Sequence, residues 1–212
     1  GGWRNFKPRM ARWKHLNLAP HTAESLTREI VHLDSGVVIS SDDGRTFQFL
    51  GEARIPEAGS DEHMIVQRSD GSLWMLVRTL YGIGQSTSRD GGITWAPGTK
   101  YTNHVATRFF IRRLKSGRLL MVRHNLPSGK VRSHLTAYLS GDEGETWNSS
   151  LLLDERSAVS YPDGVQAPDG RIYIIYDRER TAAREILMAT FSEDDVRNGK
   201  AISPRARLRV CV

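Results

Sequence analysis

Cysteine is nearly absent from the sequence: Cys211 is the single cysteine among 212 residues. One thiol permits neither an internal disulfide nor a zinc site built from paired cysteines, so packing and hydrogen bonds must hold the fold together. The chain also lacks any apolar run that approaches the roughly 20 residues of a membrane-spanning helix. We therefore expect no membrane span.

A signal peptide is likewise missing at the start, because Gly1-Gly2-Trp3 opens the chain and no basic segment leads into an apolar stretch. This observation leaves the compartment open. A secreted or periplasmic location is expected only if a segment preceding Gly1 carries the signal.

Charge of one sign is in slight excess: 30 Lys and Arg oppose 24 Asp and Glu, for a formal net charge of +6. Such a balance favours encounters with anions. The basic residues are scattered along the chain instead of forming a run, which argues against nucleic acid as the partner. The hydrophobic fraction of 39% and the charged fraction of 25% are those of an ordinary globular domain.

One octapeptide occurs three times. Its skeleton is Ser-x-Asp-x-Gly-x-Thr-aromatic, and the copies read SSDDGRTF at 40–47, SRDGGITW at 88–95 and SGDEGETW at 140–147. Recurrence at about 50 residues, with strand signals between the copies, predicts a β-propeller or a related array of supersecondary units.

Short strands between Asp-Gly and Ser-Gly turns extend this repeat into a map of the chain. Turn signals at 69–71, 115–117 and 168–170 alternate with the octapeptides, and apolar or alternating segments run between them. We predict an all-β fold, a β-propeller of four-stranded antiparallel blades, within a single domain over residues 1–212. The predicted divisions are a half blade at 36–58 and blades at 61–104, 105–157 and 158–212, with residues 1–35 unplaced.

The blade count is about three and a half to four, whereas closed propellers usually have about four to eight blades. We therefore expect the chain to be the C-terminal part of a longer propeller domain, incomplete at its N-terminus. The alternative is a small complete propeller in which residues 1–35 supply the remaining strands.

Folding alone accounts for each residue type in the octapeptide. The Ser and Asp side chains can bond turn amides, the Gly permits a positive φ, and the terminal aromatic is expected to pack under the hairpin. A metal or sugar site in each repeat is the alternative, but such a site needs converging ligands and these turns point away from one another. The octapeptide is therefore interpreted as a marker of the fold.

The opposite end of the blades is predicted to carry a cluster of polar side chains. Glu62 and Arg78 lie symmetrically about Asp70, so a hairpin with a short loop places them opposite each other. Arg132 precedes the third octapeptide by a strand length, and Tyr161 follows the strand that returns from it. All four side chains are predicted to reach one face.

Two arginines, a carboxylate and a phenol form a chemically coherent set. Arginine offers planar, bidentate donors to a carboxylate, a fork that lysine cannot reproduce. A glutamate beside a tyrosine can take the phenolic proton, which lowers the cost of using a group with a pKa of about 10 as a nucleophile. A neutral tyrosine also avoids the repulsion that a carboxylate nucleophile would meet in an anionic substrate.

The octapeptides resemble the Asp-boxes, also called BNR repeats, of the sialidase superfamily, and the resemblance covers residues 36–200. It extends through DEHM at 61–64, LWMLVRT at 73–79, RSHLTAYL at 132–139 and SYPDG at 160–164. It implies a six-bladed propeller with its site at the end opposite the Asp-boxes. It also implies an exo-glycosidase that hydrolyses a terminal carboxylated sugar of a glycan, sialic acid or a related one, with retention and without a cofactor.

The resemblance implies roles for the clustered residues. Tyr161 would be the nucleophile, Glu62 its general base, and Arg78 and Arg132 two of three arginines that bind the sugar carboxylate. The third arginine and the aspartic acid that protonates the leaving group belong to the family's first blades, and neither motif occurs in this sequence. Pro162 stands where the family often has serine. We expect Pro162 to hold Tyr161 in an extended conformation, and the difference leaves the identity of the sugar open.

Other polar residues are weaker candidates. Arg108, at the start of a strand, and Asp163 are expected to contact the substrate. The residues Asp177, Arg178 and Arg180 are expected either to do the same or to form a charged surface loop. The histidines lack metal-ligand spacing, so no metal is assigned.

Each main assignment has a structural alternative. Glu62 and Arg78 could form a cross-strand ion pair on a solvated face. Arg132 could be a surface arginine, and Tyr161 could be an aromatic residue that packs between blades. The alternative function is a catalytically idle Asp-box propeller that binds glycan or a protein partner through the same face. The oligomeric state is left open.

Overall fold

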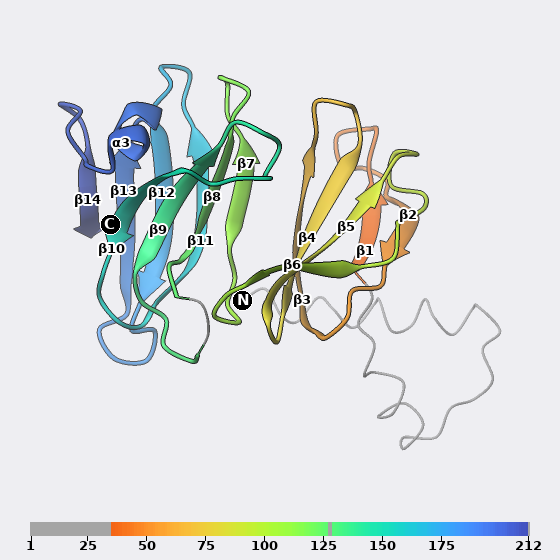
Figure 1. Ribbon diagram of the computed structural model, residues 1–212, viewed down its shortest axis with the longest axis horizontal. Coiled ribbons are helices and arrows are strands. Elements are labelled where there is room, and N and C mark those ends of the chain that lie inside the picture. Colours follow the sequence, from red (N-terminus) through yellow and green to blue (C-terminus); the bar gives the residue numbers. More distant parts are fainter. Residues whose placement is uncertain (1–34, 127–128, 212) are drawn as a thin grey trace. The chain divides into compact units, whose positions relative to one another are not determined.

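The computed structural model describes residues 35–126 and 129–211, and the N-terminal segment that the sequence left unplaced lies outside them. All of the described residues belong to one compact unit, Asp34–Val212. This unit is built from antiparallel sheets (Figure 1).

Every sheet of the described part is a meander, in which strands adjacent in the sequence are neighbours in space. A two-stranded sheet contains β1 (Ser35–Ile39) and β2 (Gln48–Ala53). Blade 1 contains β3 (Ala58–Gln67), β4 (Leu73–Thr79), β5 (Gly82–Ser88) and β6 (Thr99–Asn103). Blade 2 contains β7 (Phe110–Arg113), β8 (Leu119–His124), β9 (Leu135–Ser140) and β10 (Ser149–Asp154). Blade 3 contains β11 (Val159–Gln166), β12 (Ile172–Arg178), β13 (Glu185–Phe191) and β14 (Arg207–Cys211).

The first strands of the three blades lie next to one another. Strand β7 packs against both β3 and β11, and each of these strands is at one edge of its own sheet. Meanders that meet along their first strands are the arrangement of a β-propeller, in which each blade runs outward from a common axis. The predicted fold class, all-β with four-stranded antiparallel blades, is confirmed.

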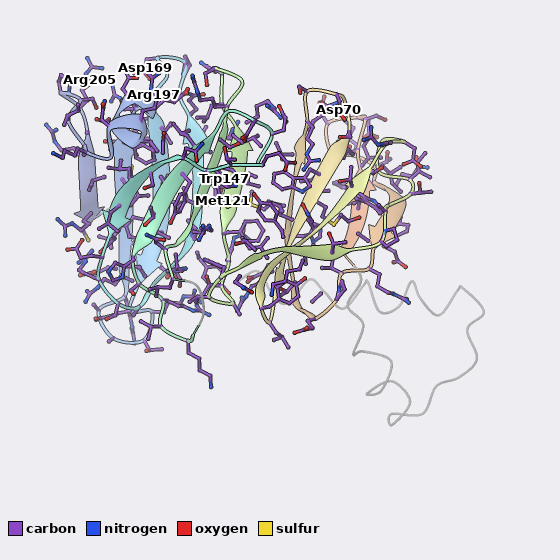
Figure 2. The ribbon with its side chains drawn as sticks, viewed as in Figure 1. Asp70, Met121, Trp147, Asp169, Arg197 and Arg205 are labelled. Carbon is purple, nitrogen blue, oxygen red and sulfur yellow. The ribbon has the colours of Figure 1, made fainter. Side chains whose placement is uncertain are left out.

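The strands of blade 2 are apolar on both faces because each face packs against a neighbouring blade. Met121 belongs to the core shared with blade 1, which also contains Trp74. Leu120, the preceding residue, belongs to the core shared with blade 3. Successive side chains of a strand point to opposite faces, so a continuous apolar run at 119–122 fits this double burial. Figure 2 shows Met121 and Trp147 in the region where blades 1 and 2 meet.

Each octapeptide closes its own turn with side-chain hydrogen bonds. In the second copy, Ser88 Oγ accepts from the Gly92 amide at 2.9 Å and donates to Asp90 Oδ1 at 2.8 Å. Asp90 also accepts from the Thr94 hydroxyl at 2.5 Å and from the Thr94 amide at 2.9 Å. These bonds, chiefly the one from the Thr94 hydroxyl, lower the pKa of Asp90 to about 2. The corresponding aspartates of the other two copies have the same lowered pKa of about 2: Asp42 and Asp142.

The aromatic residues that end the octapeptides differ in their surroundings. Trp147 donates its indole N–H to Tyr101 of β6 at 2.5 Å, so the third octapeptide is bonded to blade 1. Gly144 of the same octapeptide lies against Trp74 so closely that an added Cβ would be 2.5 Å from the indole ring. Phe47, in contrast, is 63% exposed, so the expectation that every such aromatic packs under its hairpin is wrong for the first copy. Within the described residues β1 and β2 have no further strand beside them, and no neighbouring strand there covers the ring.

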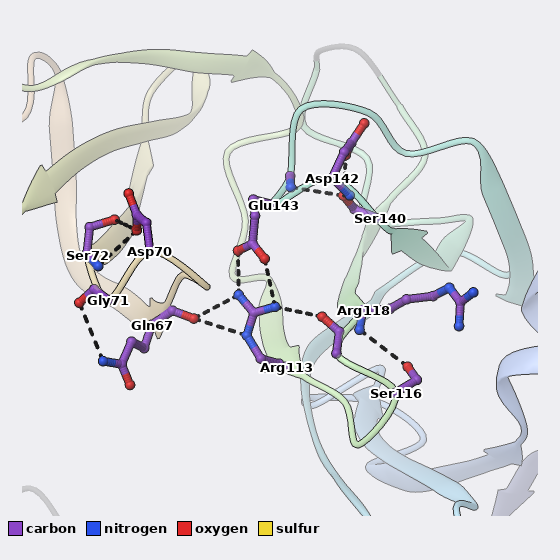
Figure 3. A network of polar contacts seen from close by, with 12 residues as sticks. Gln67, Asp70, Gly71, Ser72, Arg113, Ser116, Arg118, Ser140, Asp142 and Glu143 are labelled. Atoms are coloured by element: carbon purple, nitrogen blue, oxygen red, sulfur yellow. Dashed lines mark hydrogen bonds and ion pairs between the residues drawn. The ribbon is translucent and has the colours of Figure 1, made fainter.

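Arg113 on β7 joins blades 1 and 2 near the octapeptide turns (Figure 3). Its guanidinium donates to the Gln67 carbonyl on β3 at 2.8 and 3.1 Å, and to the Glu143 carboxylate of the third octapeptide at 2.5 and 3.0 Å. It also donates to the Gly117 carbonyl at 2.6 Å. One guanidinium therefore bonds two blades and an octapeptide turn together, with the charge-assisted, bidentate geometry that makes arginine pairs strong.

Blade 3 ends differently, because helix α3 (Glu193–Asn198) follows β13 where the other two blades have an octapeptide. Ser192 and Asp195 form a capping box at its start. The Asp195 carboxylate also accepts from the Ile202 and Ser203 amides at 2.8 and 2.7 Å. One aspartate thus organises the connection between β13 and β14, as the octapeptide aspartates organise theirs. No helix in the described part of the chain is long and apolar enough to cross a bilayer.

Candidate active site

The polar residues that were predicted to cluster lie at one end of the blades, opposite the end that carries the Asp70 and Asp169 turns. Asp70 and Asp169, in the first turns of blades 1 and 3, share the upper edge of the view in Figure 2. Strand β4 leaves the Asp70 turn and reaches Arg78 near its other end. Tyr161 is near the start of β11, the strand that leads to the Asp169 turn. Arg78 and Tyr161 are therefore both separated from the turns by most of a strand.

Glu62 and Arg78 face each other on β3 and β4. The two strands keep a regular register away from the Asp70 turn as far as His63 and Val77, and the register shifts beyond this pair, where Glu62 and Arg78 lie. Arg78 Nη1 lies 2.7 Å from Glu62 Oε2. The two side chains are only 19% and 18% exposed, so this ion pair does not lie on a solvated face.

The Glu62 carboxylate is ionised at neutral pH. Burial alone would raise its pKa, but hydrogen bonds from Arg78 and Tyr161, together with the nearby arginine charges, lower the pKa below the ordinary value. Arg78 is held in this position by the Ala106 carbonyl, which accepts from its Nε at 3.0 Å. A carboxylate next to a tyrosine hydroxyl can accept the phenolic proton.

Tyr161 occupies a β-bulge. Between the pairs that Ser160 and Asp163 form with β12, Tyr161 and Pro162 together oppose a single residue. The φ of Tyr161 is 55°, so the expectation that Pro162 holds it in an extended conformation is wrong. The bulge places the residue in the left-handed region instead and redirects its side chain. Non-glycine residues in that region cost about 1–3 kcal/mol each and are concentrated at functional sites.

Arg132 approaches the same tyrosine from the segment before β9. Its Nη1 donates to Ser160 Oγ at 3.3 Å, and its guanidinium carbon lies 5.9 Å from the centre of the Tyr161 ring. The Val159 amide donates to the Arg132 carbonyl at 3.2 Å, which ties this segment to the start of β11. Residues from three blades, with Glu62 and Arg78 from the first, are thereby brought to one tyrosine.

Two of the weaker candidates lie at the edge of this cluster, and two others lie within it. Arg108 Nη2 is 3.9 Å from Asp163 Oδ2, which is a loose ion pair. The guanidinium carbon of Arg180 is 3.8 Å from the centre of the Tyr161 ring, nearer than that of any other arginine described. Asp177 accepts from Arg180 Nε at 2.5 Å and therefore belongs to the same group.

Arg178 does not join this cluster. Its guanidinium is bonded to Glu179 at 2.6 Å and to Glu185 at 3.0 Å. The two arginines of the charged segment 177–180 therefore differ, because Arg178 pairs with glutamates whereas Arg180 lies against Tyr161. Sequence alone could not separate these two arginines.

His124 connects two parts of the cluster, although its spacing was considered only for metal binding. The side chain is fully buried, with Nε2 at 2.8 Å from the Val159 carbonyl and Nδ1 at 2.8 Å from the Thr107 hydroxyl. A carbonyl only accepts, so Nε2 carries the proton and Nδ1 accepts from Thr107. Burial keeps the pKa of His124 below its ordinary value, so the ring is neutral. The His124 side chain therefore links Thr107, the residue before Arg108, to Val159 at the start of β11.

The cluster carries more positive than negative charge. Its members are four arginines and three carboxylates: Arg78, Arg108, Arg132, Arg180, Glu62, Asp163 and Asp177. An excess of guanidinium groups favours an anionic ligand. Within residues 35–126 and 129–211, no group of three His, Cys, Asp or Glu side chains is arranged to hold a metal ion.

Residues 18–174 match the model of the family described as the BNR repeat-like domain. This match covers most of the chain, and the protein therefore belongs to the BNR repeat-like domain family. The resemblance of the octapeptides to the repeats of the sialidase superfamily is confirmed.

Two curated relatives are similar over most of this chain. A sialidase from Micromonospora viridifaciens is 27% identical over an alignment of 193 positions, which covers 83% of this chain and 29% of the relative. An anhydrosialidase from Macrobdella decora is 24% identical over an alignment of 214 positions, gaps included, which covers 86% of this chain and 28% of the relative. The chain thus spans less than a third of the length of either relative.

Solved structures share the fold. The intramolecular trans-sialidase of Ruminococcus gnavus, in complex with oseltamivir carboxylate, superposes with a TM-score of 0.60 at 19% identity, covering 76% of this chain and 38% of its own. The NanB sialidase of Streptococcus pneumoniae superposes with a TM-score of 0.62 at 19% identity, and the match covers 78% of this chain and 28% of that protein. An α-L-arabinanase of Penicillium chrysogenum superposes with a TM-score of 0.52 at 16% identity, and the match covers 85% of this chain and 54% of that protein. These likenesses establish the propeller fold.

Proposed function

We propose that the protein is a sialidase-like exo-glycosidase that hydrolyses a terminal carboxylated sugar with retention of configuration. The observation that carries this proposal is the placement of the Tyr161 hydroxyl next to the ionised Glu62 carboxylate, with Arg78 paired to Glu62 and the Arg132 guanidinium 5.9 Å from the centre of the Tyr161 ring. The names of the curated relatives, a sialidase and an anhydrosialidase, support the same class of substrate. Because the chain spans a minor part of those relatives, the proposal concerns the full-length gene product.

In this mechanism Tyr161 is the nucleophile and Glu62 is its base. As the phenolic oxygen bonds to the anomeric carbon, Glu62 accepts the phenolic proton and the bond to the leaving oxygen breaks, while a separate acid protonates that oxygen. Water then attacks the same carbon and gives a proton to the conjugate base of that acid, while the tyrosyl bond breaks and the phenolate recovers its proton from Glu62. Two successive inversions give net retention.

The arginines supply the preference for an acidic sugar. Arg78 uses Nη1 for Glu62 and Nε for the Ala106 carbonyl, which leaves Nη2 for a substrate oxygen. Arg132 uses Nη1 for Ser160 and retains its other donors. Guanidinium groups bind carboxylates through paired, charge-assisted hydrogen bonds, and the uncharged phenol adds no repulsion.

A catalytically idle propeller that binds an acidic glycan through the same face is the second candidate. The observation in its favour is the ion pair between Glu62 and Arg78, because the lowered pKa makes Glu62 a weaker base than a free glutamate. Such a protein would retain affinity for the sugar but would not turn it over.

An assay of the full-length protein on a fluorogenic sialoside separates the two candidates. Glu62→Gln is expected to lower kcat by about 10²–10⁴-fold, the range of general acid–base catalysis, and Tyr161→Phe by at least as much. Tyr173→Phe is the matched control, because Tyr173 lies on β12 of the same blade and bonds Arg171 instead of the cluster. NMR of the first-formed anomer tests retention.

Two results would contradict the proposal. If Tyr161→Phe keeps the parent rate, tyrosine is not the nucleophile. If the parent binds the sialoside with no turnover, on sialosides and on other glycosides of carboxylated sugars, the idle propeller is correct.

A further inference from the structure

Arg180 is placed against Tyr161 by the fold and not by chance contact of a flexible side chain. The loop after β12 reverses at Glu179, whose φ is 49° and whose amide donates to the Ala158 carbonyl at 3.1 Å. The Glu179 carbonyl accepts from the Ala182 and Arg184 amides at 2.9 and 2.8 Å. These backbone bonds fix the turn that presents Arg180.

Side-chain bonds then fix the guanidinium itself. Asp177 Oδ2 accepts from Arg180 Nε at 2.5 Å, and Ser160 Oγ accepts from Arg180 Nη2 at 2.8 Å. Ser160 donates its own proton to Asp177 Oδ1 at 2.8 Å, which closes a ring of three residues. The guanidinium lies over the Tyr161 ring at 3.8 Å, a distance typical of cation–π stacking.

The same serine oxygen also accepts from Arg132 Nη1 at 3.3 Å. Ser160 is 2% exposed and its proton and both lone pairs are used. Two guanidinium groups that share one buried oxygen lie close together, and like charges at such a distance are unfavourable unless an anion lies between or beside them. Asp177 offsets one of the two charges, since it contacts Arg180 and not Arg132.

Both arginines keep donors that point away from this ring of bonds. In the described part of the chain, Nη1 of Arg180 and Nη2 of Arg132 have no hydrogen-bond partner, and the Arg180 side chain is 46% exposed. A pair of nearby guanidinium groups with free N–H donors, beside the proposed nucleophile, matches the two oxygens of a carboxylate.

We propose that Arg180 is a specificity-determining residue that, together with Arg132, binds the carboxylate of the sugar held at Tyr161. Asp177 and Ser160 are positioning residues that orient Arg180 for this contact. The inference rests on the proposed function for the identity of the substrate, but it concerns a residue to which that mechanism gives no role.

The test compares a fluorogenic sialoside with its methyl ester, which differs only in lacking the carboxylate charge. Arg180→Gln in the full-length protein is expected to raise KM for the sialoside by about 10–100-fold, the value of a charge-assisted hydrogen bond, and to leave KM for the ester within about twofold. Arg180→Lys should recover only part of the loss, because lysine keeps the charge without the fork. Arg184→Gln, an exposed arginine of the same loop, is the control.

An equal rise in KM for the acid and for the ester in Arg180→Gln would overturn the inference, since it would show that Arg180 only supports Tyr161. An unchanged KM for the acid would also overturn it. If the parent turns over neither compound, calorimetric binding of free N-acetylneuraminic acid and its methyl ester replaces KM. Loss of binding of the acid alone in Arg180→Gln would then support the inference although the proposed hydrolase had failed, and equal binding of both by parent and variant would refute it.

Discussion

Gly144 is the point at which an octapeptide turn touches the core of the neighbouring blade, and Gly144→Ala tests that contact. A Cβ at this position would lie 2.5 and 2.6 Å from two carbons of the Trp74 ring. Trp74 is completely buried, and its indole N–H donates to Gln85 at 2.9 Å, so the ring cannot simply move aside. Gly144 also has a φ of 90°, which disfavours any side chain.

Two costs therefore add in Gly144→Ala. A non-glycine residue at positive φ costs about 1–3 kcal/mol. Forcing an extra carbon into a packed core costs about 1–3 kcal/mol more. We expect the free energy of unfolding to fall by about 2–6 kcal/mol, a large fraction of the total stability of a domain.

Gly117→Ala separates the two costs. Gly117 has a φ of 86°, but nothing lies within 4 Å of the position its Cβ would take. Its replacement should carry only the backbone cost of about 1–3 kcal/mol. The difference between the two variants then measures the contact between the octapeptide and Trp74.

Urea unfolding of the parent and both variants, followed by tryptophan fluorescence and by circular dichroism, gives these free energies if the slopes with urea agree. In a double-mutant cycle, Trp74→Leu removes the obstacle, so the combined loss with Gly144→Ala should be smaller than the sum of the single losses. Equal losses for Gly144→Ala and Gly117→Ala would refute the reasoning, because the third octapeptide would then not pack against blade 1 as described.

Three further predictions follow from the same contacts. The pKa of Asp142 falls from 3.8 to about 2 on folding, so its stabilising contribution is present above pH 3.8 and is lost as the pH falls toward 2. In Asp142→Asn, acid unfolding monitored by circular dichroism should therefore depend less on pH across this window. Arg113→Ala should lower the stability measured by urea unfolding by about 1.5–3 kcal/mol, because it leaves the partly exposed Glu143 and the Gln67 carbonyl without their shared partner. His124→Leu should lower the stability by about 1–3 kcal/mol, because the buried Val159 carbonyl loses the donor at His124 Nε2, and should lower kcat by displacing the start of β11.

Each of these has a matched comparison. Asp169→Asn, in a turn outside the octapeptides, should leave the acid transition unchanged, and an equal effect there would remove the octapeptide from the explanation. Arg112 lies next to Arg113 on β7 but is exposed, so Arg112→Ala should leave the stability nearly unchanged. A loss of stability comparable to that of Arg113→Ala would show that the bonds of Arg113 to Gln67 and Glu143 are not the cause. For His124, a loss of stability with kcat and KM unchanged would contradict its positioning of Tyr161.

Much of the fold could be predicted because its signals are local. The hydrogen bonds that close each octapeptide turn join residues no more than four apart, such as Ser88 to Gly92 and Thr94 to Asp90. The ion pair of Glu62 and Arg78 could be predicted because one tight turn sets the hairpin register as far as His63 and Val77, the residues next to them. Helix α3 was not predicted, since a capped helix of six residues leaves almost no periodic pattern.

The surroundings of Tyr161 could not be predicted in the same way. Its left-handed conformation contradicts the preference expected before proline, because the bulge in β11 is imposed by pairing with β12. The distinction between Arg178 and Arg180 depends on a turn in which the Glu179 amide donates to the carbonyl of Ala158, the residue before β11. His124 reaches Val159, 35 residues further along the chain, and no spacing rule connects the two.

The sequence by itself therefore determined the repeat, the turns, the class of fold and the hairpin pair of Glu62 and Arg78, because the groups that satisfy one another there are neighbours in the chain. Only the tertiary structure decided which further charges join them around Tyr161, so that Arg180 lies in the cluster and Arg178 does not. Those residues come from three blades and are bonded across long stretches of sequence, so their meeting depends on the packing of β7 against β3 and β11 and not on any local preference.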